Sequence, residues 1–135
     1  MFAVKIKTYF FDADPAGIIF YGNLFKYLHS AYEDFMKSLN MKRNYFFDEE
    51  YVLPILHTEA DYISPIKVGD ELTIKIQVSK MKKSSFELSY KIYKQNNDLA
   101  ATAKTVHVCV TKSNFKKSEL PKELNDKLKK HMIEK

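Results

Sequence analysis

Apolar and polar residues alternate along the start of the chain. Val4, Ile6, Thr8 and Phe10 occupy one set of positions, and Lys5, Lys7 and Tyr9 lie between them. A period of two places successive side chains on opposite faces of an extended segment. We therefore expect residues 3–10 to form a strand.

After residue 23 the hydrophobic period lengthens to three and four residues. One side carries Leu24, Leu28, Ala31, Phe35 and Leu39, joined by Phe25, Tyr32 and Met36, and the other side carries Lys26, His29, Ser30, Glu33 and Lys37. This pattern predicts an amphipathic helix of about four to five turns. We expect Asn23 to be its N-cap and Asn40 to end it.

The rest of the chain is dominated by strand patterns. We expect strands at residues 51–63 (broken near Pro54), 72–79, 86–92 and 99–111, separated by short turns. Short turns between alternating strands predict antiparallel meander pairing. Leucines spaced by four after Pro121 predict a short C-terminal helix at about residues 120–133.

These elements define an α+β fold of one domain, residues 1–135. The chain contains no repeat, low-complexity segment or linker, and 135 residues suffice for one core. A sheet with one apolar face needs a cover, and one helix with an apolar stripe is present. We expect a curled antiparallel sheet of about five strands wrapped around one long central helix.

The composition indicates a globular cytoplasmic protein. Hydrophobic residues make up 45% of the chain, charged residues 29%, and the one cysteine fits a reducing compartment. Lys5 and Lys7 interrupt the apolar start, which lacks the small-residue cleavage site of a signal peptide. No apolar run approaches the ~20 residues of a membrane span.

A net charge of +5 indicates an anionic partner. Nucleic-acid binding would require a basic stripe with aromatic platforms or a known recognition motif, and the sequence shows neither. We therefore expect no nucleic-acid partner. The adjacent Lys82 and Lys83 suit a small ligand that carries phosphate groups.

The segment FDADPAGIIFYGN, residues 11–23, concentrates acidic residues and turn-forming residues before the helix. Asp14 precedes Pro15, so it should be extended and should cap a short helical turn that begins at the proline. Gly17 permits a sharp turn. A carboxylate beside unpaired N–H groups at a helix start is a workable hydrolytic site. The alternative is that Asp12 and Asp14 only cap a turn.

Two segments carry a family resemblance. FFDADPAGIIFYGNLFKYLHSAYEDF resembles the signature of hotdog-fold acyl-CoA thioesterases of the 4-hydroxybenzoyl-CoA thioesterase family: D-x-D-x-x-G, an aromatic residue, an Asn and the helix. ADYISPIKVGDEL is similar to that family's second hallmark strand. The resemblance covers residues 4–112, and the family fold is the curled sheet around a helix.

The resemblance implies roles for particular positions. Asp14 matches the catalytic carboxylate, and the backbone N–H of Tyr21 matches the group that polarises the thioester carbonyl. Gly17 and Asn23 match the substrate-binding part of the motif. Where many relatives have His or Pro, this chain has Gly22, so the resemblance leaves base catalysis to Asp14 alone.

Further substrate-binding residues are expected outside this motif. Lys82 and Lys83 lie where relatives place basic residues near the CoA phosphates. Glu59 and Asp61 alternate on one face of a strand, so they either line the pocket or face solvent.

Three helix residues and one strand histidine are also of interest. His29, Tyr32 and Glu33 form H-S-A-Y-E, similar to the dihydroxynaphthoyl-CoA thioesterase branch, and are candidates for shaping the site. A polar helix face is the alternative. We expect His107 to be structural.

Few groups are needed for thioester hydrolysis. A thiol titrates near ~8.5, so the thiolate leaves without strong acid assistance. Asp14 would act as general base or nucleophile, and the backbone N–H would stabilise the oxyanion. No cofactor is implied, and no metal, because the histidines lack ligand spacing and there is no cysteine cluster.

Two other functions compete with an acyl-CoA thioesterase. One is a non-catalytic acyl-CoA or acyl-carrier-protein binding module, and the other is a hotdog dehydratase or hydratase. The latter typically uses a histidine, which residues 11–23 lack. The sequence does not choose among aryl, short-chain and long-chain acyl groups.

Self-association is the last expectation. The strand at residues 99–111 is apolar on both faces, unlike a solvated edge. The resemblance implies two subunits paired edge to edge with each active site at their boundary. We therefore expect a homodimer or homotetramer.

Overall fold

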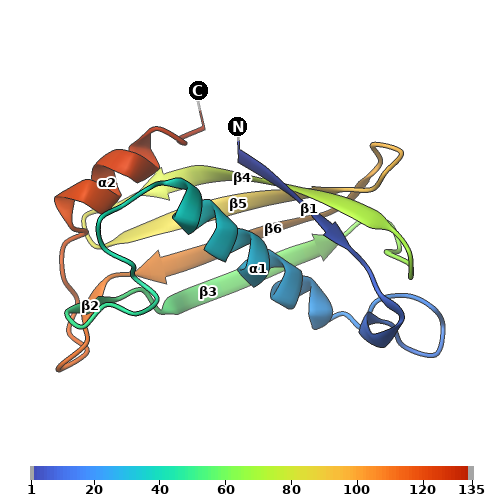
Figure 1. Ribbon diagram of the computed structural model, residues 1–135, viewed down its shortest axis with the longest axis horizontal. Coiled ribbons are helices and arrows are strands. Elements are labelled where there is room, and N and C mark those ends of the chain that lie inside the picture. Colours follow the sequence, from blue (N-terminus) through green and yellow to red (C-terminus); the bar gives the residue numbers. More distant parts are fainter. Residues whose placement is uncertain (1, 134–135) are drawn as a thin grey trace.

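A computed structural model describes residues 2–133 as a curled sheet and two helices (Figure 1). The elements are β1 (Phe2–Lys7), a single 3-10 turn (Phe10–Asp12), α1 (Asn23–Ser38), β2 (Tyr51–Val52), β3 (Ile55–Tyr62), β4 (Glu71–Met81), β5 (Ser85–Tyr93), β6 (Leu99–Val108), β7 (Val110–Thr111) and α2 (Lys122–Lys129). Residues 1, 134 and 135 of the expected domain lie outside the described part.

The main sheet is antiparallel, with the strand order β1-β4-β5-β6-β3. Strands β4, β5 and β6 form the predicted meander, and β3 pairs with the outer side of β6. The expectation that the strand at residues 99–111 is unlike a solvated edge agrees with the position of β6 inside the sheet. This strand is apolar on both faces and has a neighbour on each side, and the edges are β1 and β3.

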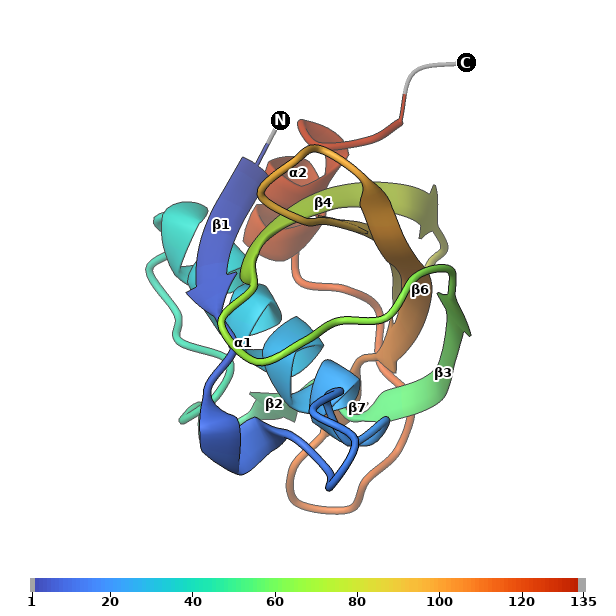
Figure 2. The same cartoon turned by 90° about the vertical axis from the view of Figure 1, so that its right-hand side faces the viewer.

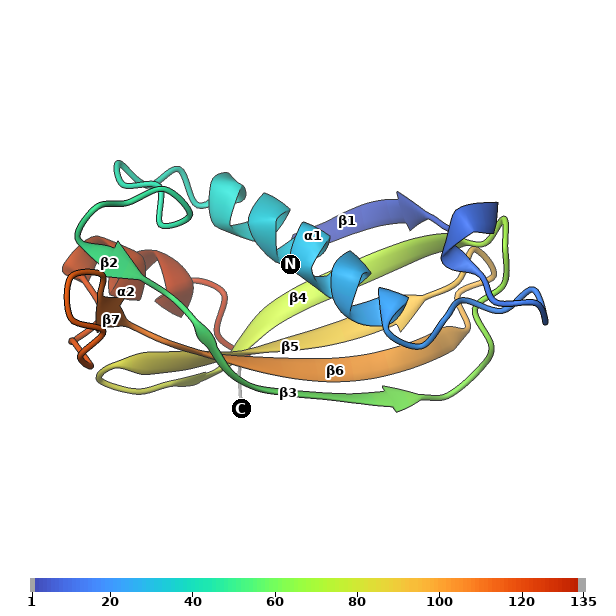
Figure 3. The same cartoon turned by 90° about the horizontal axis from the view of Figure 1, so that it is seen from below.

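The sheet curls around α1, as the view along the strands shows (Figure 2). Seen from below, α1 runs across the concave face (Figure 3). The α1 residues that are buried are Leu24, Tyr27, Leu28, Ala31, Tyr32, Phe35 and Met36. They pack against the alternating apolar residues of β4 and β5. The predicted amphipathic stripe is confirmed. The expectation of one long central helix is not met in full, because α1 has 16 residues and α2 is a second helix.

The two ends of α1 differ in how well the sequence predicts them. The N-cap is Gly22, and Asn23 is already helical, so the expected cap is wrong. The Asn23 amide instead donates to the Asp12 carbonyl at 2.7 Å. Asn40 adopts a left-handed conformation (φ 52°) just after the helix, which is a common way for helices to end, as predicted.

Several predicted strands end early. The first strand stops at Lys7, and Phe10, expected on its apolar side, is 85% exposed in the 3-10 turn. The break near Pro54 is confirmed, since β2 and β3 flank it. A further break at Cys109 separates β6 from the short β7, which pairs with β2.

Helix α2 packs at the end of the molecule opposite the 3-10 turn (Figure 1). It is shorter than predicted, and Leu124 and Leu128 are fully buried. Beyond it, the Val78 N–H donates to the His131 carbonyl at 2.9 Å. Within residues 2–133, no helix has the length and hydropathy that crossing a membrane requires.

Candidate active site

Residues 13–19 form a tight loop before α1. Ala13 bridges Ile19, and the Asp14 N–H donates to the Ile18 carbonyl at 2.9 Å. The Gly17 N–H donates back to the Asp14 carbonyl at 3.0 Å, and Gly17 has φ +77°, a conformation that favours glycine. The loop lies at one end of the molecule and leads into the start of α1 (Figure 1).

The Asp14 side chain is exposed and caps a turn. Its Oδ1 accepts the Ala16 N–H at 2.8 Å, so the segment from Pro15 is an Asx-type turn and not the expected helical turn. Within residues 2–133 the other oxygen, Oδ2, accepts no hydrogen bond from the protein. One carboxylate oxygen is thus open to solvent and to a substrate.

Asp12 has the opposite environment. Its side chain is only 2% exposed, and it accepts hydrogen bonds from Lys26 Nζ at 2.7 Å and from the Tyr9 N–H at 3.2 Å. Burial tends to raise the pKa of this carboxyl, but the hydrogen bonds outweigh burial and the net pKa is lowered. Asp12 fixes the loop to α1, so of the two carboxylates only Asp14 is exposed.

The start of α1 has free backbone donors. The N–H groups of residues 23–25 donate to carbonyls three residues earlier. Within residues 2–133 the N–H groups of Tyr21 and Gly22 donate no hydrogen bond, and Gly22 has no side chain to cover them. The positive end of the helix dipole points here, so an oxyanion would be stabilised.

Tyr62 was not predicted from the sequence. Its hydroxyl donates to the Tyr21 carbonyl at 2.6 Å and so holds this residue in place. Position 62 has the same parity as Thr58 and Ala60, which face α1 on β3. The alternation of β3 could have shown that Tyr62 shares a face with Thr58 and Ala60. The alternation alone does not show which face of the strand points to α1.

Glu59 lies on the other face of β3. Since Thr58 and Ala60 face α1, the intervening Glu59 points away from it. Its Oε1 is 3.3 Å from His57 Nε2, on the same exposed face. In one chain Glu59 therefore does not join Asp14.

Lys82 and Lys83 lie at the far end of the sheet. In the turn between β4 and β5 the Lys82 N–H donates to the Ser85 carbonyl at 2.8 Å. Lys83 Nζ is 3.0 Å from Glu119 Oε1. The 11 residues of β4 separate this turn from the Asp14 end, a span of about 35 Å. One chain does not bring these lysines to Asp14.

An apolar hollow of about 310 Å³ adjoins the free donors. It is lined by Ile18, Ile19, Tyr21, Tyr62 and residues 63–66. Because Tyr21 forms part of the wall, a ligand bound in this hollow would lie beside the unpaired N–H groups.

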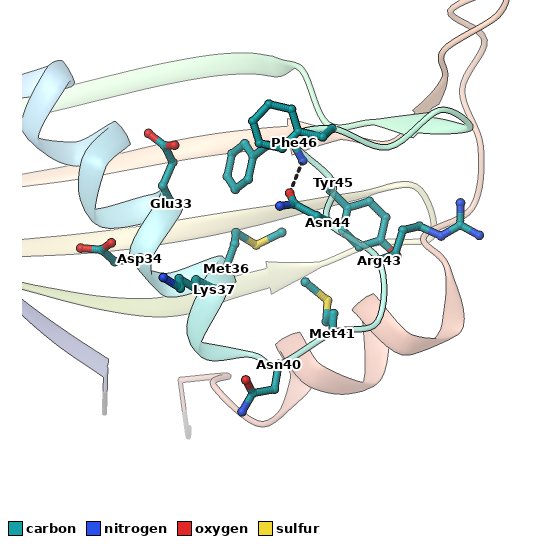
Figure 4. A pocket seen from close by; sticks show the side chains of 11 residues that line it. Glu33, Asp34, Met36, Lys37, Asn40, Met41, Arg43, Asn44, Tyr45 and Phe46 are labelled. Atoms are coloured by element: carbon teal, nitrogen blue, oxygen red, sulfur yellow. Dashed lines mark hydrogen bonds between the residues drawn. The ribbon is translucent and has the colours of Figure 1, made fainter.

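A larger hollow of about 460 Å³ lies at the other end of α1 (Figure 4). Glu33 and Lys37 line it, and Arg43 turns its guanidinium outward toward Asp48, 2.9 Å away. Lys37 lies about 24 Å along the helix axis from Tyr21. This hollow is therefore too distant to adjoin the unpaired N–H groups of Tyr21 and Gly22 in the same chain.

The fold and this loop together define a class of protein. A five-stranded antiparallel sheet curled around a helix, with an acidic loop at the helix start, is the architecture of hotdog-fold thioesterases. The sequence profile of the Thioesterase-like superfamily matches residues 10–128. The chain belongs to this superfamily.

Several proteins of this superfamily that resemble the chain have a more specific name. The chain is 34% identical over 119 residues to the 1,4-dihydroxy-2-naphthoyl-CoA hydrolase of Synechococcus elongatus, covering 87% of each chain. It is 34% identical over 113 residues to the enzyme of that name from Gloeothece citriformis, covering 82% of this chain and 79% of the relative. The crystal structure of a 1,4-dihydroxy-2-naphthoyl-CoA thioesterase from Synechocystis superposes with a TM-score of 0.86 at 26% identity, covering 94% of each chain.

These comparisons confirm the prediction of a hydrolase of the thioesterase class. They support the broad superfamily, whereas the narrower 4-hydroxybenzoyl-CoA thioesterase family was expected from the motif. The roles expected for Asp14, Tyr21, Asn23 and the other site residues stay predictions.

Proposed function

We propose that the chain hydrolyses an aromatic acyl-CoA thioester of the 1,4-dihydroxy-2-naphthoyl-CoA type. The observation that carries the proposal is that one segment before α1 holds both an exposed Asp14 carboxylate and a Tyr21 N–H that donates no hydrogen bond within residues 2–133. Relatives at 34% identity, named as 1,4-dihydroxy-2-naphthoyl-CoA hydrolases, supply the substrate class.

In the proposed reaction the thioester carbonyl oxygen accepts the Tyr21 N–H. Asp14 either removes a proton from the attacking water or attacks the carbonyl carbon itself. The carbon–sulfur bond then breaks, CoA leaves as the thiolate, and the acid is released directly or after hydrolysis of the acyl-aspartate. The N–H and the helix dipole stabilise the oxyanion before the bond breaks.

The proposal includes a homodimer. All β3 residues except Ala60 are exposed, and the outer edge of this strand has no partner among residues 2–133. Edges of this kind are normally covered. Antiparallel pairing of two β3 strands about a twofold axis would place the far end of one chain beside the Asp14 loop of the other. In that arrangement Lys82 and Lys83 become candidates for the CoA phosphates.

A free-thiol assay over a panel of CoA thioesters tests the activity. The panel is 1,4-dihydroxy-2-naphthoyl-, benzoyl-, butyryl- and palmitoyl-CoA, and we expect the highest kcat/KM with the first. Thiol release from none of them would contradict the activity and favour a binding module. Preference for palmitoyl-CoA would contradict the aromatic substrate class.

Sedimentation tests the assembly. We expect a dimer at micromolar concentration. A stable and active monomer of 15.8 kDa would contradict the dimer and the role of the two lysines.

A further inference from the structure

A cavity of about 250 Å³ lies between α1 and the sheet. Phe25, Leu28 and Tyr32 of α1 form one wall, and Thr58, Tyr90 and His107 belong to the wall made by β3, β5 and β6. It is separate from the hollow beside Tyr21 and from the hollow at the end of α1.

The polar side chains of the sheet wall lie within hydrogen-bond distance of one another, and His107 Nδ1 is buried without a hydrogen-bond partner among residues 2–133. The Tyr90 hydroxyl is 2.9 Å from Thr105 Oγ1, which is 2.8 Å from His107 Nε2. The His107 ring is stacked between Tyr32 and Phe86, with centroid distances of 4.4 and 4.9 Å. The cavity therefore presents mainly rings and methyl groups; the imidazole of His29, which also lines it, lies 3.9 Å from Glu33 Oε2. A flat apolar group is the ligand that such walls favour.

The size of the cavity sets the size of that group. An apolar cavity of about 150 Å³ is large enough to bind benzene. The additional volume here fits a second fused ring. An extended acyl chain is narrower than a fused ring system, so it would leave part of the cavity between the aromatic walls empty.

The position of the cavity matches the proposed reaction. Phe25 lies four residues after Tyr21, or about 6 Å along the helix axis, and Tyr32 lies about 16 Å along it. A thioester carbonyl at the Tyr21 N–H would thus extend its rings along α1 toward the cavity. Thr58 and Ile55, both exposed on β3, lie at the accessible side of the cavity.

We propose that this cavity binds the two-ring aromatic part of the acyl group by shape, and that Thr58 determines this specificity. The assignment rests on the proposed thioesterase function, because it takes the Tyr21 N–H as the carbonyl site. It goes further by assigning the acyl group to residues of β3, β5 and β6 that lie outside the Asp14 motif.

Binding of unreactive analogues tests the assignment without turnover. In 2-naphthacyl-CoA and acetonyl-CoA a methylene separates the sulfur from the carbonyl, so neither is hydrolysed as a thioester. Calorimetry would compare wild type, Thr58→Phe and the matched control His57→Phe, which puts the same ring on the opposite face of β3. We expect Thr58→Phe to weaken 2-naphthacyl-CoA binding by about 10-fold or more and to leave acetonyl-CoA binding within about twofold. His57→Phe should bind both analogues like wild type.

Three results would overturn the assignment. They are equal weakening of both analogues by Thr58→Phe, no weakening of either, and a wild type that binds 2-naphthacyl-CoA no more tightly than acetonyl-CoA. If the binding pattern holds and no thioester is hydrolysed, the proposed function fails and the cavity assignment stands. If thioesters are hydrolysed and Thr58→Phe weakens both analogues equally or neither, the cavity assignment fails and the proposed function stands.

Discussion

His107 gives a stability prediction that follows from its burial. The side chain is fully buried between two aromatic rings. Burial, with a smaller contribution from the nearby charge of His29, lowers the pKa of His107 from 6.5 to about 4. The folded protein therefore keeps this imidazole neutral at a pH where the unfolded chain protonates it.

The sign and size of the effect follow from proton linkage. Between the two pKa values the unfolded state binds more protons, so stability falls as the pH falls from about 6.5 to about 4. The full loss is about 3 kcal/mol, and about 2 kcal/mol of it appears between pH 7 and pH 5.

Urea unfolding of wild type and His107→Phe at pH 7, 6 and 5 measures this effect. Phenylalanine keeps a ring between Tyr32 and Phe86 but removes the hydrogen bond between Nε2 and Thr105 Oγ1, at a cost of about 1 kcal/mol at any pH. We expect the difference in unfolding free energy to move by about 2 kcal/mol in the variant's favour between pH 7 and pH 5. Protein concentration must be constant, because assembly would contribute to stability. A difference that stays constant within about 0.5 kcal/mol would refute a buried neutral His107.

Three further variants probe the site. Tyr62→Phe removes the hydroxyl that holds the Tyr21 carbonyl, so we expect kcat to fall about fivefold with KM little changed; an unchanged kcat would contradict this positioning role. Gly17→Ala forces a side chain into a positive-φ conformation and should cost about 1–2 kcal/mol in urea unfolding; equal stability would show that the loop relaxes freely. Replacing Lys82 and Lys83 together by alanine should raise KM for CoA thioesters more than it lowers kcat, with little effect on a pantetheine thioester. Equal effects on both substrates would make these lysines structural or solubilising.

The elements that the sequence predicts well are those whose periodicity is a local property. The stripe of α1 and the alternation of β4 and β5 correspond to burial on one face. The tight loop around Asp14 was also predictable, because Pro15 fixes its own φ and Gly17 permits the positive φ that the turn requires. Its acidic residues separate into a buried Asp12 and an exposed Asp14 only when Lys26 packs against the loop.

The parts that were mispredicted depend on contacts between distant segments. Alternation does not say which strand is a neighbour, so the pairing of β3 with β6 was not predicted, although residues 99–111 were recognised as unlike a solvated edge. Glu59 and Asp61 do share a face, but the register of β3 against β6 decides that this face points away from α1. Asparagine is a common N-cap residue, so Asn23 was expected to cap α1. Its side-chain amide instead donates to the backbone carbonyl of Asp12.

The most direct test of the proposed chemistry is the turnover of Asp14→Asn with 1,4-dihydroxy-2-naphthoyl-CoA. Asparagine keeps an oxygen that can accept the Ala16 N–H, so the loop should persist while the carboxylate is lost. The matched control, Asp126→Asn, makes the same change on the exposed surface of α2 at the other end of the molecule. We expect kcat to fall by about 10²-fold or more in Asp14→Asn, with urea stability preserved, and to be unchanged in Asp126→Asn. Near-normal turnover by a well-folded Asp14→Asn would contradict Asp14 as the catalytic carboxylate.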